Sequence, residues 1–125
     1  MKKSMAAASL PNWPVLRKAL LARCRNRCEL CGGEMLGRWE ANHRRPRGMG
    51  GTRRADTHLL SNLTALHPHC HKYLTEHPGE GRELGQFIRQ HQDPASSPLR
   101  LFGGTWVLLS ADGRYLPVTE AQGAA

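Results

Sequence analysis

The chain has 125 residues, with 18 lysines and arginines against 10 acidic residues and a calculated pI near 10.1. This length predicts one domain with a modest core. No apolar run approaches the roughly 20 residues that a membrane-spanning helix needs, so composition excludes a membrane-spanning protein. The positive charge favours a polyanionic partner, with nucleic acid as the first choice, and a basic protein without such a partner is the alternative.

The N-terminal segment MKKSMAAASLP begins like a signal peptide, but its apolar stretch is short and Pro11 follows at once. We therefore interpret residues 1–11 as a disordered basic tail and expect a cytoplasmic protein. The four cysteines could form two disulfides in a secreted chain. Without a signal peptide, and with histidines beside Cys70, we favour metal ligation instead.

Residues 12–26 are predicted to form the first helix, because Asn12 is a good N-cap and Pro14 suits a first helical turn. Apolar side chains then recur at steps of three and four along one face. They are Trp13, Leu16, Leu20 and Cys24.

Two strands and a second helix are predicted after this first helix. Residues 35–43 alternate weakly, as in a strand, and residues 62–67 form the second strand. An arginine- and glycine-rich loop separates the strands. A helix over residues 70–77 should stop near Pro78. Helix and strand compete over residues 84–88 because Gly85 interrupts the pattern, and the turn at residues 111–113 predicts a C-terminal β-hairpin.

Two short knuckles contain the residue types that bind transition metals. Cys28 and Cys31 are separated by two residues, and so are His67 and Cys70. Each turn can direct two side chains at one centre, and thiolates favour zinc over magnesium or calcium. We assign His67 as the fourth zinc ligand. Cys24 is the alternative, although its place on the apolar stripe fits a buried core thiol.

The ordered motifs CELCGG, ANHRRPRGMGG and SNLTALHPHCH resemble the HNH family of endonucleases, especially its small zinc-containing members from bacteriophages and bacteria. The resemblance implies a ββα-metal fold, or His-Me finger, in which a hairpin and one helix hold a divalent ion. We therefore expect an α+β protein whose small core is stapled by a structural zinc, with an N-terminal helix and a C-terminal β-hairpin.

The resemblance also assigns roles to three residues. His43 corresponds to the histidine that deprotonates the attacking water, a role that suits the unperturbed imidazole pKa of about 6.5. Asn62 corresponds to the asparagine that orients this histidine, and His71 to a ligand of the catalytic cation. That cation would be Mg²⁺, Mn²⁺, Ni²⁺ or Zn²⁺ and would act as a Lewis acid. The implied products carry 3′-hydroxyl and 5′-phosphate ends.

One position departs from the family pattern. The residue before the first histidine is usually an aspartate or histidine that ligates the cation, whereas this chain has Asn42. We expect Asn42 to ligate through its neutral amide oxygen. In order of preference, we expect weaker binding of the cation or the use of a different metal, then slower catalysis, then loss of activity.

The loop after His43 supplies the predicted DNA contacts. Its arginines should bind phosphates, which positions a duplex without reading its sequence and makes binding sensitive to salt. A solvated loop is the alternative. The residues are Arg44, Arg45, Arg47, Arg53 and Arg54.

Taken as a whole, the sequence predicts a metal-dependent HNH endonuclease that nicks or cuts double-stranded DNA with low specificity. It would act in the bacterial cytoplasm, that of the host if a phage encodes it, and a phage-packaging or other protein partner stays open. The alternatives are a zinc-knuckle DNA-binding module without catalysis and a degenerate nuclease kept as a scaffold. The expected organisation is a nuclease core at 12–78, an extension at 79–119 and a disordered tail at 120–125.

Overall fold

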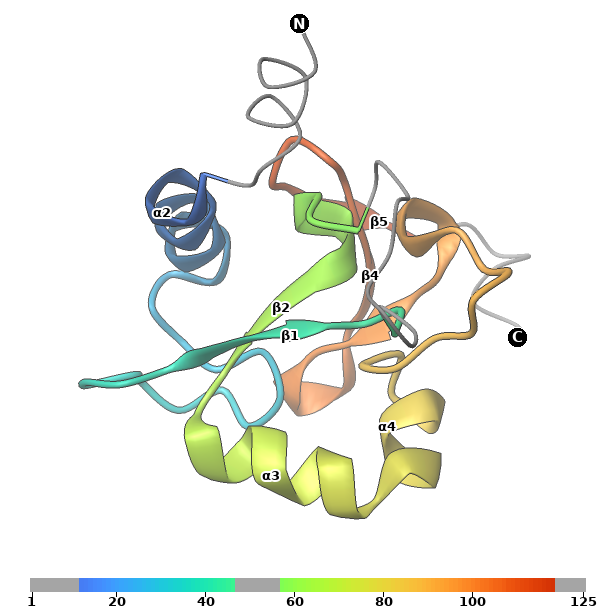
Figure 1. The fold of residues 1–125 in the computed structure, drawn as a ribbon, viewed down its shortest axis with the longest axis horizontal. Helices are drawn as coiled ribbons and strands as arrows, with labels where there is room; N and C mark the ends of the chain where they lie inside the picture. Colours follow the sequence, from blue (N-terminus) through green and yellow to red (C-terminus); the bar gives the residue numbers. More distant parts are fainter. Residues whose placement is uncertain (1–11, 47–56, 119–125) are drawn as a thin grey trace, which may run out of the picture.

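A computed structural model describes residues 12–46 and 57–118 of the chain. An antiparallel hairpin of β1 and β2 lies at the centre, with helices beside it and a second, three-stranded sheet of order β3-β4-β5 (Figure 1). This mixture confirms the predicted α+β class. The predicted tails at 1–11 and 120–125, and residues 47–56 of the basic loop, lie outside the described residues.

Helix α2 (Trp13–Cys24) begins as predicted, because the side chain of Asn12 accepts a hydrogen bond from the backbone N–H of Val15 at 3.2 Å. It ends at Cys24 rather than at residue 26, because Arg25 adopts a left-handed φ of 55°. The predicted apolar stripe faces the core, where Leu20 is fully buried.

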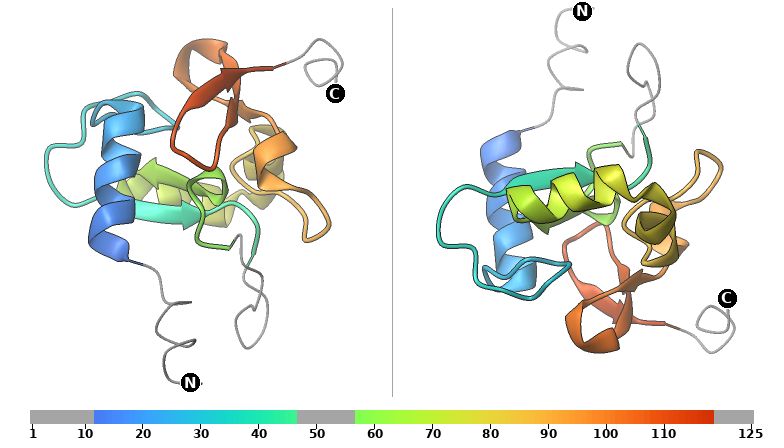
Figure 2. Two further views of the ribbon diagram at one scale, coloured as in Figure 1. Left: turned by 90° about the horizontal axis from the view of Figure 1, so that it is seen from above. Right: turned by 90° about the horizontal axis from the view of Figure 1, so that it is seen from below.

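The central hairpin pairs β1 (Glu40–His43) with β2 (Leu63–Leu66), both shorter than the predicted strands. Glu40 lies opposite Leu66 and His43 opposite Leu63. Every residue of β2 is buried, because α2 covers one face of the hairpin and α3 (Pro68–Glu76) the other (Figures 1 and 2).

Successive β1 side chains point to opposite faces of the hairpin. On the α2 side, the guanidinium of Arg17 stacks over the Trp39 ring at 3.9 Å. On the α3 side, His71 contacts Glu40. His43 therefore shares the α2 side with Trp39, while Asn42 shares the α3 side with Glu40.

The remaining elements follow α3. No strand or continuing helix forms at residues 84–88, where the prediction was divided, because Gly85 has a φ of 77° and an added Cβ would lie 2.0 Å from the carbonyl oxygen of Pro98. The predicted C-terminal hairpin is present, and β3 is a strand that the sequence did not predict. The bounds are α4 (Pro78–Glu83), β3 (Leu99–Arg100), β4 (Trp106–Leu109) and β5 (Tyr115–Pro117), with short 3-10 turns η1 (Leu60–Asn62), η2 (Pro94–Ser96) and η3 (Phe102–Gly104). Within the described ranges, no helix is both long and apolar enough to cross a membrane.

A buried ion pair links α2 to the first knuckle and to the second sheet. Arg23 and Glu29 are each 1% exposed at the side chain and approach to 2.7 Å. The carboxylate of Glu29 also accepts from the hydroxyl of Tyr115 at 2.6 Å and from the backbone N–H of Ala65 at 2.8 Å. Burial, together with the negative charge of Glu29, raises the pKa of Tyr115, which keeps this phenol a donor. The charge is thus fully hydrogen-bonded, as a buried pair requires.

Candidate functional site

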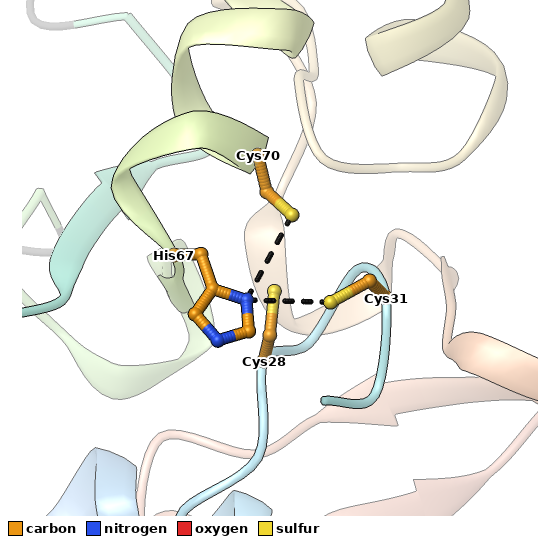
Figure 3. A group of neighbouring side chains, drawn as sticks. All are labelled: Cys28, Cys31, His67 and Cys70. Atoms are coloured by element: carbon orange, nitrogen blue, oxygen red, sulfur yellow. Dashed lines mark hydrogen bonds between the residues drawn. The ribbon is translucent and has the colours of Figure 1, made fainter. Parts of the chain in front are cut away.

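The two predicted knuckles meet in one cluster. The ligand atoms of Cys28, Cys31, His67 and Cys70 all lie within 4.8 Å of one another (Figure 3). Nδ1 of His67 is 3.3 Å from Sγ of Cys31 and 4.0 Å from Sγ of Cys70. Zinc–sulfur bonds of about 2.3 Å and zinc–nitrogen bonds of about 2.0 Å in a tetrahedron separate ligand atoms by roughly 3.5 to 3.8 Å. The cluster therefore fits a zinc ion.

Neighbouring groups set the tautomer of His67 and the ionisation of the thiols in a way that favours a bound cation. Nε2 of His67 lies 3.1 Å from the backbone oxygen of Glu34, so its hydrogen can be donated there and Nδ1 is left as the ligand. Burial opposes ionisation of Cys28, but hydrogen bonds from backbone N–H groups lower the pKa of its thiol. Burial and the Cys28 sulfur raise the pKa of Cys70. A thiolate at Cys70 beside the sulfur of Cys28 is thus unfavourable without a cation between them.

Cys24 lies apart from this cluster. Its side chain packs in the main core with Leu20, and its Sγ is 3.9 Å from the carbonyl oxygen of Leu21. Burial and the charge of Glu29 raise the pKa of this thiol. The structure therefore gathers His67, and not Cys24, with the three other donors.

His43 occupies the last position of β1, beside two aromatic neighbours. Its Nε2 lies 3.1 Å from Nδ1 of His58, and the Trp13 ring meets both imidazoles edge-on, with centroids 6.0 Å and 5.3 Å away. His43 also lines a cavity of about 460 Å³ whose walls include Arg82 and Arg89. The imidazole is thus held by packing, and the residue stands at the wall of a basic cavity.

Asn62 fastens the two ends of the basic loop that follows His43. Its Oδ1 accepts from the backbone N–H of Arg45 at 2.8 Å, and its Nδ2 donates to the carbonyl of Thr57 at 2.9 Å. The backbone oxygen of Asn62 also accepts from the N–H of Arg44 at 2.8 Å. Two of these three contacts are therefore with the chain immediately after His43.

Asn42 differs from its predicted role as a metal ligand. Its side chain donates to Oγ1 of Thr64 at 3.1 Å and to the carbonyl of Gln86 at 2.9 Å, and only 2% of the residue is exposed. So little accessible surface leaves no approach for a hydrated cation. We correct the prediction accordingly: Asn42 joins the C-terminal extension to the hairpin.

His71 has a carboxylate partner that the sequence did not identify. Its Nδ1 lies 2.8 Å from Oε1 of Glu40, and both side chains are about 30% exposed. The hydrogen bond from His71 lowers the pKa of the Glu40 carboxyl. An ionised carboxylate accepts the Nδ1 hydrogen, which leaves Nε2 as the acceptor atom of His71. In the part of the chain that the structure describes, only the thiol-rich cluster gathers three or more metal-binding side chains.

Two of the predicted DNA-binding arginines are buried, so that prediction is wrong for them. Arg44 is 0% exposed and Arg45 is 3% exposed. The guanidinium of Arg44 donates to backbone carbonyls of Gly85, Ser61, Pro94, Ser97 and Pro98. Burial lowers the pKa of Arg44 to about 9, which still leaves the group charged at neutral pH. Arg47, Arg53 and Arg54 lie outside the described residues.

A hairpin and helix beside a thiol-rich knuckle pair define a zinc-stapled protein of the ββα-metal class. Residues 28–77, two fifths of the chain, match the model of the HNH endonuclease family. This match agrees with the resemblance that the motifs of the same segment predicted. No curated protein and no solved structure matches the chain.

Sequence reasoning missed four residues around this site: Glu40, His58, Arg82 and Arg89. For Glu40 a signal existed, since it stands two residues before Asn42 and so shares its face of the strand. His58 and the two arginines carry no local signal, because their positions depend on how the loop and the extension fold back onto the hairpin.

Proposed function

We propose that this protein is a metal-dependent HNH endonuclease that hydrolyses phosphodiester bonds of double-stranded DNA, by nicking or by cleavage of low specificity. The observation that carries the proposal is His43, held at the end of β1 against the rings of Trp13 and His58 and lining a basic cavity. The HNH match, which includes this residue, supports the same chemistry. We further propose that the protein acts in the cytoplasm, where its zinc-binding thiols would stay reduced.

In the proposed reaction, His43 accepts a proton from the water that attacks phosphorus. Nε2 of His43 contacts His58, so the second imidazole can share the proton taken up. Asn62 would keep the base in place through the backbone at Arg45 and Thr57. The zinc held by the knuckles would have a structural role, since four protein donors leave it no open position.

Glu40 and His71 are the residues that we propose for the catalytic cation. A cation there would stabilise negative charge on the scissile phosphate. Glu40 begins β1 and His43 ends it, with Cα atoms about 10 Å apart at 3.3 Å per residue, and the two side chains point to opposite faces. The base and the cation ligands are therefore tested by separate variants.

The test of catalysis is a supercoiled-plasmid nicking assay in Mg²⁺, Mn²⁺, Ni²⁺ and EDTA. We expect metal-dependent nicking by the wild type and at least a roughly 100-fold loss in His43→Ala, on the scale of a lost general base. His91→Ala, which removes an exposed imidazole that does not line the cavity beside His43, is the control and should cut normally. Equal nicking by His43→Ala and wild type would refute His43 as the base.

Glu40→Ala tests the proposed cation ligands. Because the carboxylate fixes the orientation and tautomer of His71, its loss should raise the Mn²⁺ concentration for half-maximal nicking by about 10- to 100-fold. The Nε2–H tautomer of His71 should also grow in the imidazole ¹⁵N spectrum. Glu76→Ala removes an exposed carboxylate at the end of α3 and should change neither quantity. An unchanged tautomer and an unchanged metal requirement in Glu40→Ala would contradict the assignment.

A zinc-knuckle DNA-binding module without catalysis is the second candidate, and the burial of Asn42 favours it. In that case the wild type would bind DNA and cut it in none of the four conditions. An origin in a bacterium or bacteriophage stays a prediction from the motifs.

A further inference from the structure

The surface beside His43 contains a longer hollow than the cavity that this residue lines. A second cavity, of about 570 Å³, extends on to Trp106 and Pro98. The two cavities share four lining residues: Arg82, Phe87, Ile88 and Arg89. The two cavities therefore adjoin along these residues, and together they are here called the arginine groove, with His43 at one end and Trp106 at the other.

The charge of the arginine groove suits a polyanion. Arg82 and Arg89 are exposed, and neither has an ion-pair partner among residues 12–46 and 57–118. Glu83 is a carboxylate on the wall toward Trp106. No described residue lining the half that contains His43 is acidic. Positive charge is therefore concentrated next to the proposed base, where a phosphate would have to lie.

The far end of the arginine groove offers aromatic surface. Trp106 is 41% exposed, and Phe87 is half-buried in the shared wall. Proteins that hold single strands commonly combine arginines along the phosphates with aromatic rings on which bases stack. Because phosphate contacts and an exposed ring succeed one another along this groove, it fits an extended nucleic-acid strand better than a compact ligand.

We propose that the arginine groove binds the DNA strand that passes His43, with Arg82 and Arg89 on its phosphates and Trp106 against a base. The proposal rests on the proposed function for the identity of the polyanion. It adds that these contacts come from the C-terminal extension, beyond the segment that matches the HNH family. It also supplies phosphate-binding residues in place of the buried Arg44 and Arg45.

The experiment measures binding, so that it does not depend on cleavage. Zinc-loaded full-length protein carrying His43→Ala is titrated against fluorescein-labelled duplex and single-stranded 12-mers over a range of salt concentrations. Adding Arg82→Gln and Arg89→Gln should weaken duplex binding roughly tenfold and lower the slope of log affinity against log salt by about 1.8, since each lost phosphate contact contributes about 0.9. Lys18→Gln with Arg25→Gln removes the same charge from the exposed side of α2 and should change the slope far less.

The aromatic end has its own variants. Trp106→Leu should weaken binding of the single strand roughly tenfold, while Trp106→Phe keeps a ring and should retain most of it. Equal slopes of log affinity against log salt in the Arg82/Arg89 variant and the Lys18/Arg25 control would overturn the proposal that the arginine groove binds DNA. This holds whether or not the wild type cuts DNA. Tighter binding of RNA or of a poly-glutamate peptide than of DNA would overturn it as well. Absence of nicking with the groove effects intact would remove the catalytic proposal alone.

Discussion

Cys70→Ser, or zinc removal by a strong chelator, is expected to unfold the HNH domain. Cys70 belongs to the four-donor cluster that joins the first knuckle to the start of α3. A structural zinc contributes on the order of 10 kcal/mol in small zinc-stabilised domains, which is comparable to the roughly 5 to 15 kcal/mol stability of a whole domain. Circular dichroism during thermal unfolding, with zinc content by mass spectrometry, measures both effects.

Cys24→Ala is the matched control for zinc loss. It also removes a buried thiol, but one that packs in the core apart from the cluster. We expect full zinc content and a loss of about 1 kcal/mol, the usual cost of a small core truncation. A Cys70→Ser protein with wild-type zinc content and melting temperature would contradict the ligand assignment. Zinc loss in Cys24→Ala would also contradict the ligand assignment, because it would mean that Cys24 binds the zinc.

Arg44→Met is expected to lower the free energy of unfolding by about 3 kcal/mol or more, because each buried acceptor left unsatisfied costs about 1 to 3 kcal/mol and several lose their donor here. Methionine can fill the space of the arginine stem but donates no hydrogen bond, so carbonyls of Gly85, Ser61 and Ser97 lose their partner. Urea unfolding at neutral pH measures the change.

Arg89→Met is the control for this prediction, because it removes an exposed arginine and should change stability by no more than about 0.5 kcal/mol. The two variants also separate two interpretations of Arg44. A phosphate-binding arginine on a loop would leave stability unchanged when replaced and would weaken DNA binding instead. That outcome would contradict the buried position of this side chain.

The sequence was sufficient where a short segment carries its own signal. The capped start of α2, the paired knuckles and the turn of the C-terminal hairpin all depend on residues close together in the chain. The choice of His67 over Cys24 as fourth donor also followed from local pattern, because Cys24 continues an apolar stripe. In each case, spacing alone determined which side chains share a face or a turn.

The sequence was insufficient where distant segments meet. The arginine- and glycine-rich pattern predicts that Arg44 and Arg45 are loop residues exposed to solvent. The C-terminal extension instead folds over them and supplies carbonyls that bind Arg44. The family pattern predicts that Asn42 is a metal ligand. Its side-chain amide instead donates a hydrogen bond to the backbone carbonyl of Gln86, which is distant in the sequence. Burial of polar groups depends on such tertiary partners, and single-residue propensities carry no information about them.

The family boundary and the physical boundary of this domain do not coincide. The match to the HNH family ends at residue 77, but four of the five carbonyls that accept from Arg44, and one of the two acceptors of Asn42, belong to residues 85 to 98. A fragment trimmed at residue 77 would open a guanidinium and a carboxamide to water and strip the hairpin of its cover. The shortest piece of this chain that can be transplanted as a folded unit therefore has to include the segment that lies beyond the family match.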